Sequence, residues 1–369
     1  MRLIPCRKIS DGVELARDVV TGPPGTAPLL RAGVCLSERY ATLLPKAGVG
    51  SVWIEDDLGA DIDVVEPLAP ETRARVYRVT GDALQAAGDA LRSGSGMPSA
   101  VVDSLTDVAG AMVADLVDSP DAALSLHDLA AFDSYTHRHS VQVTVLGLLI
   151  ARLAWRTDGW TDYRGRRRRD RLDERLRKLG LGLLVHDIGK LSVPPEVLNK
   201  PGSLTDEETG LMRGHPEAGV ELLRAADLSP LTLSVIRDHH ERPDGAGYPE
   251  GLVGAEVQEF PRIAAVADVY DAVTSERVYK AAAPPHVGHR VIREGAGTQF
   301  CPDVTRHFRA VVMAYPVGHE IALPDGRTGV VAAVDPADPD RPTVRVAGAS
   351  GVEELTVDLT PPPGETAAA

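Results

Sequence analysis

The spacing of apolar residues changes twice along the chain. Up to residue 66, short apolar runs such as Ser51–Ile54 are separated by Gly, Pro and Asp, which is typical of short strands and turns. Between residues 71 and 315, apolar residues recur every three or four positions, as in Val101, Leu105 and Val108, and this period indicates helices. In the segment from 317 to 359, apolar and polar residues alternate, so strands are predicted again.

We therefore predict a mainly α protein, with a central helical bundle flanked by small β-rich domains. Pro67 and Pro70 mark the first linker, and Pro316 precedes the second change of pattern. The predicted division is a small β-rich N-terminal domain at 1–66, a helical connector at 67–129, a helical domain at 130–315, a small β-rich C-terminal module at 316–360 and a tail at 361–369.

Local signals place several helix ends. Thr205–Glu208 forms a capping box that opens a helix toward His215, and Ser229 followed by proline marks the start of another. A buried helix is predicted from Leu176 to a glycine at 189, and a further helix from Phe260 to residue 279. In the N-terminal domain, the segment 37–46 predicts a short helix.

The chain is 369 residues long and acidic, with 39 Lys and Arg, 53 Asp and Glu, and a formal net charge of −14. Binding of long nucleic acid through general electrostatics is therefore not expected. The run Arg166–Arg169 is interleaved with acids such as Asp162 and Asp170, which favours a solvated loop or the start of a helix. A small dianionic nucleotide is still a suitable ligand if metals or nearby cationic side chains make the electrostatic potential at its binding site positive.

Three features predict a cytoplasmic protein. The cysteines, Cys6, Cys35 and Cys301, are odd in number and widely spaced, which suits a reducing compartment rather than a disulfide framework or a zinc knuckle. The first residues are basic but no apolar block follows them, so no signal peptide is expected. The longest apolar stretch, Val141–Trp155, is too short to span a bilayer.

Histidines and carboxylates gather in the helical middle of the chain. They are His139, His186, Asp187, His215, His239, His240 and Asp268. Burying an imidazole beside a carboxylate is costly unless the two pair or bind a metal, and side chains on different helices can converge in a bundle core. This mixture of ligands suits iron, manganese, zinc or nickel. It also exceeds the three or four ligands of a single catalytic zinc, so two metals are favoured.

Short motifs continue through residues 130–310. They are His186–Lys190, Lys200–Gly202, Leu204-Thr205, His215-Pro216, His239–Pro249, Arg262-Ile263, Ala267–Ala272, Ser275–Tyr279 and Gly297–Pro302. In order and spacing they resemble the HD-GYP family of the HD phosphohydrolase superfamily. The His-Asp pair alone indicates only the superfamily, and the Gly-Tyr-Pro segment narrows the resemblance to the family.

The resemblance implies an all-helical HD bundle that holds two divalent metal ions, iron or manganese. The implied metal ligands are His139, His186, Asp187, His215, His239, His240 and Asp268, with Asp187 bridging the ions. Asp187 and Lys190 are the implied catalytic residues, and Lys190 would lie beside the scissile phosphate. The implied substrate-binding residues are Lys190, Gly247, Tyr248, Arg277 and Lys280.

The resemblance also implies a phosphodiesterase that hydrolyses cyclic di-GMP. As a hypothesis, a hydroxide that bridges the metals attacks phosphorus and the 3′ oxygen leaves, which gives pGpG and, after a second cut, GMP. Two alternatives stay open: a phosphodiesterase for another cyclic dinucleotide, and a catalytically weak adapter that binds partner proteins. Signalling proteins are candidate partners, and a homodimer through residues 71–130 stays open because no heptad run is long enough to predict one.

Three departures from the family pattern change the expectations. Some members carry a glutamate, and a third metal, where this chain has Tyr135, so two metals are expected. Cys301 stands where an aspartate is usual, and no ligand role attaches to that position. The segment 155–179 is longer and more basic than usual, and it is open whether it is a lid, a partner surface or a plain insertion.

Overall fold

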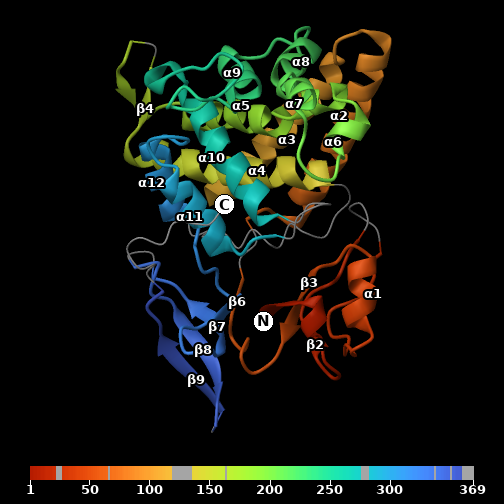
Figure 1. Cartoon of the computed structure of the whole chain (residues 1–369), viewed down its shortest axis with the longest axis vertical. Helices are drawn as coiled ribbons and strands as arrows, with labels where there is room; N and C mark the ends of the chain where they lie inside the picture. Colours follow the sequence, from red (N-terminus) through yellow and green to blue (C-terminus); the bar gives the residue numbers. More distant parts are fainter. Residues whose placement is uncertain are drawn as a thin grey trace. The chain divides into compact units, whose positions relative to one another are not determined.

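The computed structural model describes residues 1–21, 27–64, 67–118, 135–162, 164–275, 282–335, 338–349 and 351–359. The chain folds into two compact units (Figure 1). The larger unit is helical and includes Pro67–Ala122 and Ser134–Val311, whereas the smaller unit combines Met1–Glu66 with Val312–Ala369. The predicted architecture, a helical bundle with β-rich segments at both ends, is confirmed.

The helical unit contains eleven named α-helices within the described residues. They are α2 (Pro70–Ser93), α3 (Ser99–Asp118), α4 (Tyr135–Thr157), α5 (Leu172–Val185), α6 (Pro195–Leu198), α7 (Asp206–Arg213), α8 (His215–Leu222), α9 (Pro230–Asp238), α10 (Glu259–Thr274), α11 (Pro285–Glu294) and α12 (Pro302–Val311). Two 3₁₀ segments, η3 (Ile188–Ser192) and η4 (Gly254–Glu256), and a hairpin of β4 (Trp160–Thr161) and β5 (Arg167–Arg168) connect them.

Helix α4 forms the centre of the helical unit, with α5 and α10 packed against it (Figure 1). Every residue from Ser140 to Ala151 is buried, which requires neighbours on all sides because an all-round apolar helix cannot face water. In α3, the regularly spaced apolar residues Leu105, Val108, Met112 and Leu116 are buried, whereas Val101 is half-buried. Among the described residues, no helix combines the length and apolar character needed to cross a membrane.

The predicted helix ends are confirmed at two positions and corrected at a third. Thr205 forms the capping box with Glu208 at the start of α7, and the Ser229 hydroxyl accepts a bond from Leu231 N at the start of α9. The helix predicted to reach residue 189 ends at Val185 instead. The chain tightens into η3 because Gly189 packs directly on the backbone of α8: a Cβ at Gly189 would lie 2.0 Å from His215 O.

Two other helix predictions differ at their boundaries. Helix α10 ends at Thr274, and Ser275 is extended, so the predicted end at residue 279 falls among residues 276–281, which lie outside the described part. The short N-terminal helix begins at Tyr40 rather than at residue 37 and is α1 (Tyr40–Lys46).

The two ends of the chain share a core. Strands β1 (Arg2–Pro5), β3 (Ser51–Glu55) and β2 (Glu14–Leu15) form one sheet, and β6 (Glu320–Ala322), β7 (Thr328–Ala333), β8 (Thr343–Gly348) and β9 (Gly351–Thr356) form a second, antiparallel sheet. Trp53, Ile62 and Val64 pack with Val330 in one apolar cluster. The sequence pattern did not indicate this contact. The predicted division of the chain into five parts by residue range stays a prediction.

The arginine-rich segment forms an exposed hairpin whose charges are paired locally. Arg166 lies 3.4 Å from Asp162, and Arg168 lies 2.7 Å from Asp170. The hairpin is anchored by Arg175 on α5, whose guanidinium lies 4.1 Å from the Trp160 ring centroid. Because nearby carboxylates already neutralise much of its charge, the hairpin is a solvated segment, as expected, rather than a basic patch.

Candidate metal centre

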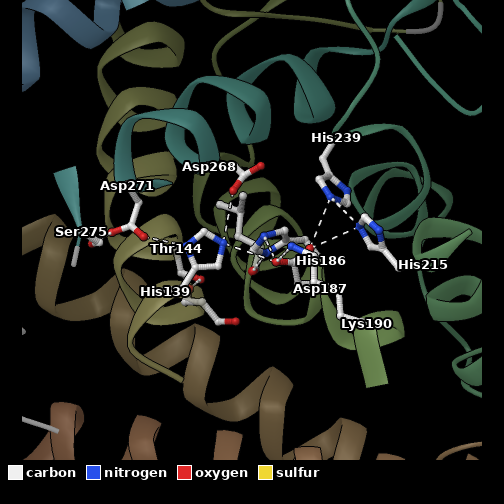
Figure 2. A network of polar contacts seen from close by, with 12 residues as sticks. His139, Thr144, His186, Asp187, Lys190, His215, His239, Asp268, Asp271 and Ser275 are labelled. Carbon is white, nitrogen blue, oxygen red and sulfur yellow. Dashed lines mark hydrogen bonds and ion pairs between the residues drawn. The ribbon is translucent and has the colours of Figure 1, made fainter. Parts of the chain in front are cut away.

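Asp187 lies at the centre of the site, just beyond the end of α5 (Figure 2). Its carboxylate is 4% exposed, and its two oxygens face different histidines. Oδ2 lies 3.4 Å from Nε2 of both His139 and His186. Oδ1 lies 3.3 Å from His215 Nε2 and 3.7 Å from His239 Nε2. One buried carboxylate therefore joins two groups of imidazoles.

All seven predicted ligand residues come together in the structure. Within each of two groups, the possible ligand atoms lie within 4.8 Å of one another; the groups are His139, His186 and Asp268, and Asp187, His215, His239 and His240. The side chains come from α4, the end of α5, the start of α8, the end of α9 and α10. Figure 2 shows Asp187 and His186 between His139 and Asp268 on one side and His215 and His239 on the other.

Carbonyl groups orient three of the histidines. His186 Nδ1 lies 2.8 Å from Leu183 O, and His215 Nδ1 lies 2.7 Å from Met212 O. His239 Nδ1 is held in the same way by the carbonyls of α9, 3.0 Å away at the nearest. A carbonyl oxygen can only accept, so each Nδ1 donates its hydrogen, and in the neutral imidazole each Nε2 keeps a bare lone pair. Those lone pairs face the centre, which is how proteins orient imidazoles toward metals.

The contacts between these atoms fit a bound cation. The Nε2 atoms of His215 and His239 lie 3.3 Å apart, and two lone pairs at that distance repel each other unless a positive charge lies between them. His186 Nε2 and Asp187 Oδ1 are buried and find no hydrogen-bond partner in the part of the chain that the structure describes, which is costly for polar atoms. A metal ion bound by each group would remove both costs.

The protonation states favoured at His239, His240 and Asp187 are those of metal ligands. Burial and the neighbouring His239 lower the pKa of His240 to about 2, and burial lowers the pKa of His239. Burial alone would raise the pKa of Asp187, but Lys190 and His186 hold it well below its ordinary value. These groups are therefore neutral imidazoles and an ionised carboxylate near neutral pH, as metal binding requires.

Asp271 is a functional residue that the sequence interpretation missed. Its Oδ2 lies 2.6 Å from His139 Nδ1, and its Oδ1 accepts a bond from Ser275 Oγ at 2.8 Å. Burial would lower the pKa of His139, but bonds to Asp187, Asp268 and Asp271 raise it well above its ordinary value. Positive charge is thus favoured here, and a divalent ion can supply it in place of the proton. The spacing of three residues from Asp268 was the available signal, because it puts both carboxylates on one helix face.

Lys190 is placed close to the bridging carboxylate. It lies in η3, and its Nζ is 2.5 Å from Asp187 Oδ2. Its side chain is 28% exposed, in contrast to the buried imidazoles of His139, His186, His215 and His239. The ammonium group therefore lies between the buried cluster and the solvent-facing side of the site.

The Gly-Tyr-Pro loop lies against the ligand histidines. The Tyr248 ring stacks on His240, with centroids 4.7 Å apart and planes at 22°. Gly247 approaches the preceding backbone so closely that a Cβ would lie 2.5 Å from Arg242 N. Glu241 was missed by the sequence interpretation: it is 2% exposed and accepts bonds from the backbone N–H groups of residues 250, 251 and 252. Its position after two histidines was the only signal, and residue type alone does not reveal burial.

The remaining predicted positions are not part of the described cluster. Arg277 and Lys280 lie outside the described residues, as does the side chain of Tyr135. Cys301 is half-buried with its Sγ 4.0 Å from an Arg262 nitrogen, and it belongs to neither ligand group.

Comparisons with known proteins find an HD-domain family and relatives that are named as phosphodiesterases. Residues 150–304 match the family model described as HD domain. The chain is 36% identical to the cyclic di-GMP phosphodiesterase of Pseudomonas aeruginosa over 327 residues, which cover 82% of this chain and 75% of that protein. It is 41% identical to the 3′3′-cGAMP-specific phosphodiesterase 2 of Vibrio cholerae, over 26% of this chain and 19% of that protein.

A solved structure described as an HDG"Y"P protein of Bdellovibrio bacteriovorus aligns with 83% of this chain and 97% of its own, at 16% identity and a TM-score of 0.48. The long match to the Pseudomonas protein shows the family, and the HD-domain match over residues 150–304 agrees with it. The chain belongs to the HD-GYP family of the HD phosphohydrolase superfamily.

Proposed function

We propose that this protein is a phosphodiesterase that hydrolyses cyclic di-GMP at a centre of two metal ions. One observation carries the proposal: the two oxygens of buried Asp187 face two separate groups of metal-ligand residues. A pair of metals that shares one carboxylate is suited to clamp a phosphodiester. The Pseudomonas relative, which is named for this activity, supports the choice of substrate.

The residues of the cluster fit two divalent ions. His139, His186 and Asp268 would hold one ion, and His215, His239 and His240 the other, with Asp187 shared. When bound, the ions would supply positive charge to the phosphate and acidify a water molecule. Imidazoles mixed with carboxylates favour transition metals over calcium or magnesium, and we propose iron or manganese.

The chain itself would bind the substrate and handle its charge. Lys190, beside Asp187 at the partly exposed edge of the cluster, would stabilise negative charge at phosphorus and give a proton to the departing 3′ oxygen. Hydrolysis of that P–O bond adds water across it and leaves linear pGpG, and a second cut would give GMP. Tyr248 and Gly247 would form the wall of the pocket, and Arg277 and Lys280 would contact substrate phosphate.

A second cyclic dinucleotide is the main alternative substrate. The chain is 41% identical to a 3′3′-cGAMP-specific phosphodiesterase over 98 residues, and this similarity supports another cyclic dinucleotide as the alternative substrate. The adapter alternative has less support, because all seven ligand positions carry ligand residues and converge. A cytoplasmic location, a homodimer through residues 71–130 and signalling-protein partners stay predictions.

Replacing Asp187 with alanine tests the proposal. The wild-type protein, purified without oxygen, should hold about two metal ions per chain and convert cyclic di-GMP to pGpG or GMP. D187A should lose both ions and at least 10³-fold in turnover, because it removes the shared ligand and a large electrostatic contribution. The exposed Asp173 on α5, the helix that precedes Asp187, supplies the control, since D173A should behave as wild type. Full turnover in D187A would refute the assignment.

A further inference from the structure

Arg213 lies at the mouth of the metal cluster but has no role in the proposal so far. It is the last residue of α7, and its side chain is exposed. The guanidinium carbon lies 5.2 Å from the Tyr248 ring centroid, and that ring stacks on His240. Guanidinium, tyrosine and imidazole thus follow one another from the rim of the site to its metal ligands.

The position of Arg213 is set by the same short segment that orients a ligand. The carbonyl of Met212, one residue earlier, accepts the Nδ1–H of His215 at 2.7 Å. At the other end of α7, Glu208 completes the capping box and accepts a bond from Lys200 at 2.6 Å. The helix is therefore held at both ends, and the arginine projects from a fixed backbone.

Within the described residues, no carboxylate pairs with Arg213, in contrast to other arginines of this acidic chain. Arg242, on the Gly-Tyr-Pro loop itself, binds Asp244 through two nitrogens, and Arg168 binds Asp170 in the same way. A guanidinium that lies over an aromatic ring keeps its N–H groups free in its own plane. Such an edge binds paired acceptors, as in a phosphate or the O6 and N7 atoms of guanine.

We propose that Arg213 is a substrate-binding residue that holds the cyclic dinucleotide beyond the scissile phosphate. The inference rests on the proposed function. A cyclic dinucleotide bound by one phosphodiester at the metals still presents a second phosphodiester and two bases. Arg213 binds a pair of acceptor atoms there, from the second phosphate or from a guanine edge. Its contribution is to substrate affinity, and it takes no part in the bond cleavage.

The test compares R213A and R213K with wild type and with the control R224A. Arg224 is exposed just after α8 and, among the described residues, forms an ion pair only with Glu221. R213A should raise KM for cyclic di-GMP about tenfold or more, leave kcat within about twofold, and leave the metal content unchanged. R213K keeps the charge but loses the paired geometry, so its KM should be intermediate. Hydrolysis of bis(p-nitrophenyl) phosphate, which has nothing beyond the scissile group, should be equal in all four proteins.

Equilibrium binding of cyclic di-GMP and cyclic di-AMP separates the two acceptors. If R213A binds both ligands more weakly by the same factor, Arg213 contacts the second phosphate. If only the binding of cyclic di-GMP is weakened, Arg213 contacts a guanine edge. An unchanged KM and Kd in R213A, or a parallel loss with bis(p-nitrophenyl) phosphate, overturns the proposal. If the wild-type protein binds cyclic di-GMP but does not hydrolyse it, the proposed function is wrong, and the Kd of R213A still decides the role of Arg213. If the wild-type protein does not bind cyclic di-GMP, both proposals are wrong.

Discussion

At the scale of single residues, the orientation of each imidazole depends on what its second nitrogen contacts. His186, His215 and His239 use carbonyl groups that lie three or four residues earlier in the chain, so these three are oriented by local backbone. His139 is different, because its Nδ1 meets the Asp271 carboxylate, which comes from α10 rather than from α4. Such carboxylate partners fix the ring and raise the basicity of the ligand nitrogen.

Substitution of Asp271 should therefore weaken the site without removing a ligand. D271A should lower metal affinity and turnover by about 10–100-fold, and D271N, which can still accept the Nδ1–H bond, by less. Manganese titration of the metal-free protein, together with turnover of cyclic di-GMP, measures both effects. D303A, at a largely exposed carboxylate on α12, is the control. Wild-type affinity in D271A would show that the carboxylate does not orient His139.

At the scale of elements, the Gly-Tyr-Pro loop depends on a close backbone approach. A Cβ on Gly247 would lie 2.5 Å from Arg242 N, 2.6 Å from Glu241 Cα and 2.7 Å from His240 O. All three neighbours belong to the backbone, so none can move aside as a flexible side chain would. Glu241 holds the far end of the same loop through three backbone N–H groups.

G247A should displace the loop and lower kcat/KM for cyclic di-GMP at least tenfold, because Tyr248 would lose its place on His240. The matched control is G210A on α7, where a Cβ meets nothing within 4 Å and where alanine favours the helix. Steady-state kinetics of the two variants, with metal content measured alongside, gives the comparison. The loop argument is wrong if G247A and G210A are equally active.

Packing of α11 against α12 should make the helical unit sensitive to acid. Burial, with Arg309 and Arg293 nearby, lowers the pKa of His289 to about 4, against about 6.5 in an unfolded chain. Between these values the unfolded chain binds a proton that the folded chain does not, so stability falls as pH falls. From pH 7 to pH 5 this residue should cost about 2 kcal/mol.

Urea unfolding of the metal-free protein at pH 7 and pH 5 measures this effect. In H289N the loss of stability between the two pH values should be smaller than in wild type by about 2 kcal/mol. The other histidines titrate alike in both proteins, so the difference isolates His289. An identical pH dependence in the two proteins would contradict the predicted linkage.

At the scale of the whole molecule, the smaller unit is built from the two ends of the chain, Met1–Glu66 and Val312–Ala369 (Figure 1). Val330 on β7 is 1% exposed and packs with Trp53 of β3. Backbone contacts continue the junction, since Leu3 N donates to Gly318 O at 2.8 Å. Each segment also has an apolar cluster of its own, but the cluster around Trp53 needs residues from both.

V330A should destabilise the N-terminal segment as well as its own sheet, by about 2 kcal/mol. Thermal unfolding followed by tryptophan fluorescence should shift to lower temperature, while the helical signal of the other unit keeps its transition. V352A, at a position on β9 that is 41% exposed, should change neither. If V330A leaves the environment of Trp53 unchanged, the shared core is not a stability determinant.

Much of the site could be predicted from the sequence, because its main signals are local. Helices follow from apolar residues every three or four positions, and caps such as Thr205 with Glu208 lie within a single turn. The seven ligand residues stand out because imidazoles and carboxylates are rare in apolar helical runs. Their order and spacing were enough to indicate the family that the comparisons confirm.

The tertiary structure decided what depends on distant neighbours. Which oxygen of Asp187 faces which histidines depends on the packing of α4, α8 and α9 around the end of α5. The contact of Asp271 with His139 joins residues 132 positions apart, and the burial of Glu241 depends on the loop that folds over it. The early end of α5 and the shared core of the two chain ends also depend on residues that are distant in sequence. Periodicity reports a residue's own helix or strand, whereas long-range contacts arise only when those elements pack.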